Sequence, residues 1–148
     1  MILKLSLHEK FTEGLDKFMS KFPSDGLYEP IYYLLNIHGK RMRPILALSV
    51  CEAEGASIEK AMPVAIAVEL FHNFTLIHDD IMDQASLRRG QLTAHEVYGE
   101  NAAILSGDAM FTLSRISLED VKEKALLDIL KVFNKTSREV CEGQQMDM

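Results

Sequence analysis

Hydrophobic residues recur three and four positions apart along most of this chain, and strict alternation of hydrophobic and polar residues is rare. That spacing predicts helices, at about residues 7–21, 28–36, 44–54, 57–82, 94–98 and 101–116, with a last helix starting at Ser117. Turn-forming residues at 23–26, the His38-Gly39 pair and a polar, basic loop at 84–93 interrupt the helices. The pattern indicates an all-α antiparallel bundle, with no repeat, linker or domain boundary within residues 1–148.

Several helix ends are predicted from residues that favour them. Pro44 suits the first residue of its helix because the missing N–H costs no hydrogen bond there, and Gly55 suits a C-terminal cap. Ser57 is expected to cap the long helix, although Pro63 indicates a kink or a later start. Ser117 begins a sequence that resembles a capping box, so we expect the last helix to start there.

The middle of the long helix is apolar on almost all sides. Its hydrophobic residues are Val64, Ile66, Val68, Leu70, Phe71, Phe74, Leu76 and Ile77. A helix without a polar face is typical of the centre of a bundle, and we expect this one there.

Three acidic residues, Asp79, Asp80 and Asp83, end this apolar helix. Residues four apart share a helix face, so Asp79 and Asp83 point the same way, with His72 and Leu76 nearly in line with them. A cation would relieve the repulsion between the carboxylates, and hard oxygen ligands favour Mg²⁺ or Mn²⁺. The spacing alone also fits a solvated acidic helix end.

The formal net charge of −6 argues against general nucleic-acid binding. Two basic clusters stand out against it, Lys40, Arg41 and Arg43 in one and Arg88 and Arg89 in the other. Arginine matches phosphate oxygens in paired geometry, although either cluster alone also fits a solvated basic loop. An acidic metal site and two basic clusters around an apolar helix favour a diphosphate ligand with a hydrocarbon tail.

Two cysteines, Cys51 and Cys141, belong to no C-x-x-C pair and favour reduced thiols in a cytoplasmic protein. Residues 1–10 lack the long apolar core of a signal peptide. The longest apolar stretch, residues 62–68, is too short to span a bilayer, so we expect no transmembrane segment.

Short motifs in this order resemble those of the polyprenyl synthetase family, which includes farnesyl and geranylgeranyl diphosphate synthases. They are G-K-R-M-R-P at 39–44, D-D-I-M-D at 79–83, L-R-R-G-Q-L-T-A-H at 87–95, Y-G at 98–99, S-G-D-A at 106–109 and G-Q-Q-M-D at 143–147. Leu92 and Ala94 depart from the usual family residues, which we expect to perturb the loop more than the chemistry.

The resemblance implies a Mg²⁺-dependent prenyltransferase of the isoprenoid synthase fold that condenses an allylic diphosphate with isopentenyl diphosphate and acts as a homodimer. It implies a metal site of Asp79 and Asp83 with Asp80 supporting, Arg88 on the allylic diphosphate, Gln144 and Asp147 lining that side of the pocket, and Lys40, Arg43, His72 and Arg89 on isopentenyl diphosphate. Asp79, Asp83 and Arg88 would carry the catalysis, in which metal ions and arginines stabilise the departing diphosphate.

The resemblance also places Phe74, with Thr75 beside it, where the family controls the growth of the product tail. A bulky ring there would stop the tail early, so the resemblance implies a product of fifteen or twenty carbons.

The family's second aspartate-rich motif, which normally follows G-Q-x-x-D, does not occur before Met148. We therefore expect residues 1–148 to be the N-terminal part of a synthase domain, with little or no activity alone. Two alternatives stay open: a non-catalytic subunit of a heteromeric synthase, and a fragment of a class I terpene cyclase.

Overall fold

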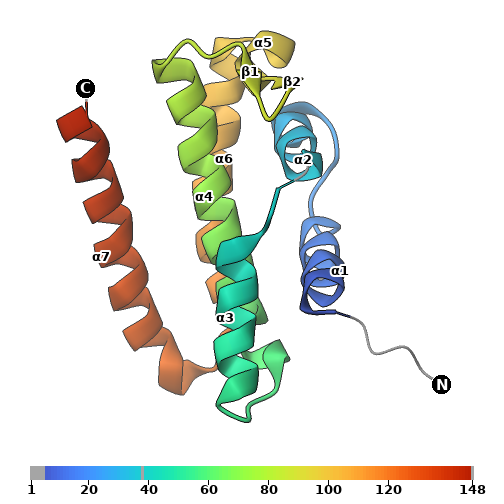
Figure 1. Ribbon diagram of the computed structural model, residues 1–148, viewed down its shortest axis with the longest axis vertical. Helices are drawn as coiled ribbons and strands as arrows, with labels where there is room; N and C mark the ends of the chain where they lie inside the picture. Colours follow the sequence, from blue (N-terminus) through green and yellow to red (C-terminus); the bar gives the residue numbers. More distant parts are fainter. Residues whose placement is uncertain (1–5, 38, 148) are drawn as a thin grey trace.

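A computed structural model describes residues 6–37 and 39–147 of the chain, and Figure 1 shows the arrangement. The helices are α1 Leu7–Met19, α2 Glu29–Asn36, α3 Met42–Ala53, α4 Met62–Met82, α5 Ala94–Tyr98, α6 Glu100–Leu118 and α7 Glu123–Asp147. Short 3₁₀ turns at Gly26–Tyr28 and Ile58–Lys60 join some of them, and two short strands form a hairpin, β1 Leu87–Arg88 and β2 Gln91–Leu92. The predicted all-α fold is confirmed. No helix in the described ranges is long and apolar enough to cross a membrane.

Helix α4 runs through the centre of the molecule, as its apolar sequence predicts, with α6 packed along it (Figure 1). Gly107 of α6 allows the close approach, because a Cβ there would lie 2.8 Å from Cγ2 of Ile77 and would overlap the His78 ring. Fully buried side chains from several helices complete the core, among them Phe11, Ile31, Leu48, Leu70, Ile77 and Met110.

Helix α7 stands apart from α4 over much of its length (Figure 1). Phe133 joins the two helices, since its ring packs edge-on against Phe71 with centroids 5.6 Å apart. Beyond this contact Val132 and Val140 of α7 remain exposed. The gap between the helices holds the larger of two cavities described below.

Helix α3 begins at Met42, two residues earlier than predicted, so Pro44 is its third residue and not its first. The difference costs no hydrogen bond, because the N–H groups of the whole first turn lack partners within a helix. Arg41, the residue before the helix, adopts the left-handed conformation with φ +47°. Gly55 has φ +71° after the other end, as expected for a C-terminal cap.

The predicted helix cap at Ser57 and the predicted helix start at Ser117 were wrong, whereas the later start indicated by Pro63 is confirmed. Ser57 precedes the 3₁₀ turn, where its hydroxyl bonds Glu59, and α4 begins later with Pro63 as its second residue. Ser117 lies inside α6, where its hydroxyl donates to the carbonyl of Pro63 at 2.7 Å, so it ties α6 to α4 and caps nothing. Helix α7 begins only at Glu123.

The predicted loop at 84–93 contains the hairpin, in which Leu87 pairs with Leu92 and Arg88 with Gln91. Arg89 and Gly90 form its turn with φ +53° and +79°, values that suit a tight two-residue hairpin. The hairpin therefore fixes the backbone of both arginines of the second basic cluster.

Candidate functional site

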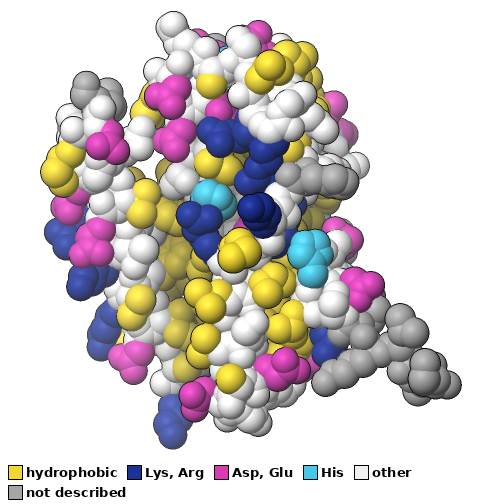
Figure 2. All heavy atoms as spheres, in the orientation of Figure 1, with side chains coloured by type: hydrophobic (Ala, Val, Ile, Leu, Met, Phe, Trp, Pro, Cys, Tyr) yellow, Lys and Arg dark blue, Asp and Glu magenta, His cyan; other side chains and the backbone are white. Residues whose placement is uncertain are grey.

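A cationic cavity of about 590 Å³ opens where the 39–43 segment meets α4 and the hairpin turn. Its lining residues are Gly39, Lys40, Arg41, Met42, Arg43, Glu69, His72 and Arg89, so four cations surround one carboxylate. Figure 2 shows Lys and Arg side chains gathered beside a histidine in the middle of this face. The structure thus brings together the four residues that the family resemblance places on isopentenyl diphosphate, Lys40, Arg43, His72 and Arg89.

Close contacts fix the shape of this cavity. Gly39 lies so near the Arg89 guanidinium that a Cβ at position 39 would overlap it. Nη1 of Arg43 lies 3.2 Å from Nε2 of His72. Burial and then the Arg43 charge lower the pKa of His72 from its ordinary 6.5, although Glu69 opposes the shift. The ring is therefore neutral near pH 7 and can accept a hydrogen bond from Arg43.

A larger cavity of about 700 Å³ lies between α4 and α7. Its walls are mainly apolar, with Val64, Val68, Phe71, Leu76, Ile129, Val132, Phe133 and Val140 among the lining residues. Arg43 and His72 line this cavity as well as the cationic one, so the two cavities adjoin. The arrangement suits a ligand with an anionic group at one end and a hydrocarbon chain along the other.

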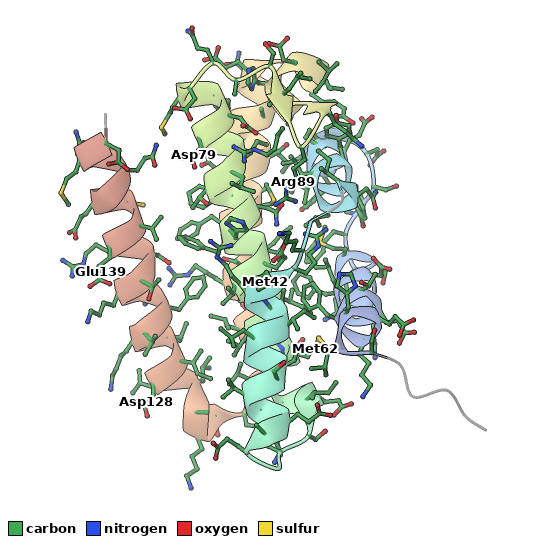
Figure 3. All side chains as sticks on the ribbon, in the orientation of Figure 1. Met42, Met62, Asp79, Arg89, Asp128 and Glu139 are labelled. Atoms are coloured by element: carbon green, nitrogen blue, oxygen red, sulfur yellow. The ribbon has the colours of Figure 1, made fainter. Side chains whose placement is uncertain are left out.

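Asp79 of α4 lines the larger cavity, and Figure 3 shows it on the central helix, with Arg89 labelled nearby. Burial, and then the charge of Asp83, raise the pKa of Asp79 above its ordinary value. Asp83 is exposed at the C-terminal cap of the helix, and its backbone N–H donates to the carbonyl of Asp79 at 2.8 Å. A divalent cation would neutralise both carboxylates and remove the cost of holding them close.

Asp80 differs from its neighbours, because its side chain is only 1% exposed and forms an ion pair with Arg88. Nε of Arg88 donates to both carboxylate oxygens at 2.9 Å, and Nη2 lies 2.8 Å from Oδ1. Asp80 thus holds Arg88 in this structure, and its supporting role at the metal site stays a prediction. Within the described residues no three acidic, histidine or cysteine side chains form a ready metal cluster.

The residues assigned to chain length divide between two environments. Thr75 lines the larger cavity, together with Phe71 one turn earlier. Phe74 is absent from that lining, and its ring packs on His78 and Phe111 at centroid distances of 4.9 and 5.2 Å. Phe71 and Phe133 therefore line the cavity, and the Phe74 ring packs on Phe71 with centroids 5.6 Å apart.

Gln144 and Asp147 lie on α7 beyond the lining of the larger cavity, which reaches Val140. Nε2 of Gln144 lies 3.9 Å from Sδ of Met82, so the ends of α7 and α4 meet near the aspartates. Asp147 is exposed, and its side chain does not line either cavity.

Comparisons with known proteins agree with this geometry. The family model described as Polyprenyl synthetase matches residues 24–148. The short chain isoprenyl diphosphate synthase of Methanocaldococcus jannaschii is 42% identical over all of this chain and 45% of its own length. The geranylgeranyl diphosphate synthase of Methanosarcina mazei is 41% identical over 91% of this chain and 42% of its own length.

The fold of the chain is also similar to that of a solved structure. The geranylgeranyl pyrophosphate synthetase from Pyrococcus horikoshii superposes with a TM-score of 0.87 and 36% identity, covering 94% of this chain and 44% of that one. The chain thus spans about half the length of the relatives it matches. With the motifs, the helical fold and the family match together, the chain belongs to the polyprenyl synthetase family.

Proposed function

We propose that this chain forms the substrate-binding half of a prenyltransferase that condenses an allylic diphosphate with isopentenyl diphosphate. The observation that carries the proposal is the pair of adjoining cavities, which share Arg43 and His72. The cationic cavity suits a diphosphate with a short tail. The larger one offers apolar walls to a longer tail, with Asp79 near the diphosphate end.

In this proposal Lys40, Arg43 and Arg89 hold the diphosphate of isopentenyl diphosphate in the cationic cavity. Guanidinium groups pair with phosphate oxygens, and the neutral His72 ring keeps Arg43 directed into the site. Arg88, held by Asp80, presents its guanidinium to the allylic diphosphate. The bond from the allylic C1 to its diphosphate breaks, the isopentenyl double bond forms the new carbon–carbon bond, and a proton is lost to the released diphosphate.

The carboxylates of Asp79 and Asp83 fit a Mg²⁺ ion, or Mn²⁺ in its place. Magnesium in phosphate sites typically takes one or two carboxylates and fills its remaining positions with phosphate oxygens and water, so a third protein ligand is not needed. The raised pKa of Asp79 supports this assignment, because burial and then the charge of Asp83 disfavour its ionised form although Arg88 opposes the shift, and a cation would favour that form. When bound, the ion would stabilise the charge of the departing diphosphate.

We further propose a short product, of fifteen or twenty carbons, because bulky aromatic rings line the larger cavity. Phe71 and Phe133 are among its lining residues, and Phe74 packs on Phe71. Geranylgeranyl diphosphate synthase is also the printed name of the Methanosarcina mazei relative. The cationic cavity favours this reaction over terpene cyclisation, which uses no isopentenyl diphosphate.

Calorimetric titration of the chain with each diphosphate tests the proposal. Isopentenyl diphosphate is expected to bind without metal. Lys40→Gln and Arg43→Gln should each weaken this binding about tenfold. Geranyl diphosphate is expected to bind tightly only with Mg²⁺. In Asp79→Asn we expect Mg²⁺ no longer to strengthen its binding. Lys135→Gln, an exposed cation on α7, is the matched control. If isopentenyl diphosphate binds equally to all these variants, the cationic cavity is not its site.

A further inference from the structure

Arg41 combines an unusual backbone with a buried side chain. Its φ of +47° and ψ of +34° are left-handed, a conformation that is unfavourable for a residue with a side chain. The side chain is only 10% exposed, although arginine is rarely buried. Strained backbone of this kind persists where surrounding contacts hold it in place.

Two contacts hold the Arg41 guanidinium. Nη1 pairs with Oε1 of Glu69, in the middle of α4, and Nη2 donates to the backbone carbonyl of Leu35, near the end of α2. One planar side chain thus joins α2 to α4. Lys40 directly precedes Arg41 in the chain, and Arg43 follows two residues later.

Glu69 is itself fixed. It is 5% exposed, and Nδ2 of Asn73, one turn later on α4, donates to Oε1 at 3.0 Å and to the Glu69 carbonyl at 2.8 Å. The carboxylate can therefore accept from Arg41 in one orientation. Replacing a buried ion pair with apolar residues is often neutral or stabilising, so stability alone does not explain this arrangement.

We infer that Arg41 is a positioning residue: anchored to Glu69 and to the Leu35 carbonyl, it holds the left-handed turn that presents Lys40 and Arg43 to a diphosphate in the cationic cavity. The inference rests on the proposed function, in which that cavity binds diphosphate. It assigns Arg41 and Glu69 a task distinct from contact with the ligand.

Glu69→Gln separates positioning from electrostatics. Removing the one acid among the lining residues should strengthen anion binding if only charge matters. If the bridge positions the turn, the loss of the charged partner releases Arg41, and inorganic pyrophosphate should bind severalfold more weakly. Tighter or unchanged pyrophosphate binding by Glu69→Gln, measured by calorimetry on the folded chain, would overturn the inference.

Arg41→Lys provides an independent test at constant charge. Lysine lacks the planar fork that reaches both acceptors, so we expect pyrophosphate to bind about tenfold more weakly. The pKa of the His72 ring, followed by NMR, should also rise, because Arg43 would leave its place beside that ring. If Arg41 only stabilised the fold, Arg41→Lys would lower the free energy of unfolding but would leave the His72 pKa and the pyrophosphate affinity of the folded chain unchanged.

The controls distinguish this inference from the proposed function. Arg138→Lys alters an exposed pair with Glu142 on α7 and should change neither readout. Weakened binding in Lys40→Gln with unchanged binding in Arg41→Lys and Glu69→Gln would sink the positioning role alone. Binding that is insensitive to Lys40→Gln would sink the proposed function itself.

Discussion

Arg88 donates from Nε to both carboxylate oxygens of Asp80, at 2.9 Å each, while Asp80 is almost completely buried. The pairing raises the pKa of Arg88 and leaves its charge secure at any relevant pH. It also separates Asp80 from Asp79 and Asp83, the two carboxylates that we propose for a cation. The second aspartate links the acidic segment to the basic hairpin.

Asp80→Asn and Asp79→Asn should therefore differ in kind. Asp80→Asn leaves Arg88 with a neutral partner, and we expect the free energy of unfolding to fall by roughly 2 kcal/mol. Metal-dependent binding of geranyl diphosphate should persist in Asp80→Asn but disappear in Asp79→Asn. Chemical unfolding and calorimetry with and without Mg²⁺ measure the two effects. Loss of the metal dependence in Asp80→Asn at unchanged stability would make Asp80 a ligand.

Gly107→Ala should destabilise the fold. The added methyl group would meet the side chains of Ile77 and His78 where α4 and α6 pack, so we expect a loss of about 2 kcal/mol, measured by urea unfolding. Gly143→Ala on α7 is the matched control, because no atom lies within 4 Å of its Cβ and alanine favours a helix. Equal stability of the two variants would contradict the close packing of α4 on α6.

Gly39→Ala should impair binding without destabilising the fold. Its Cβ would meet only the end of the flexible Arg89 side chain, which can move away at little cost. We expect an unchanged unfolding midpoint and isopentenyl diphosphate binding weaker by about tenfold, as for loss of a charged hydrogen bond. Wild-type affinity in this variant would mean that the position of Arg89 against Gly39 does not matter for the ligand.

Much of this arrangement follows from local sequence. The apolar run before Asp79 predicts a central helix, and the motif order predicts which cations meet. The sequence does not reveal that Asp80 is buried against Arg88. Asp79 and Asp80 are adjacent and lie on different faces of the helix, and only the tertiary fold decides which face is buried. The resemblance assigns tail control to Phe74, which stays a prediction. The sequence does not reveal that Phe71 lines the cavity, because that depends on how α7 packs against α4.

Other differences arise from interactions distant in sequence. Ser117 has the local character of a helix cap, but its hydroxyl bonds the carbonyl of Pro63 across the helix pair. Arg41 reads as one more cation of a basic cluster, and its pairing with Glu69 spans 28 residues. A signal was available for this pair, because Glu69 is the one acidic residue in the α4 sequence before the aspartates at its C-terminal end, and a buried carboxylate requires a partner.

The stability of the fold should depend on pH through His72. Its folded pKa is lowered by burial, Arg43 and Arg89, with Glu69 opposing, so the unfolded chain binds a proton more readily. Between the folded pKa and the ordinary 6.5, unfolding takes up a proton, so stability rises with pH and is lost as pH falls below about 6.5. His72→Gln should flatten that part of the curve in urea unfolding from pH 5 to 8. An unchanged curve would mean that the pKa of His72 is not lowered in the folded chain.

The most direct test of the account is a crystal structure of the chain with Mn²⁺, isopentenyl diphosphate and an unreactive allylic thiolodiphosphate. We predict one diphosphate in the cationic cavity, in contact with Lys40, Arg43 and Arg89, and an anomalous manganese peak on the carboxylates of Asp79 and Asp83. Diphosphate bound away from those cations, or manganese on Asp80 with its Arg88 pairing broken, would contradict it.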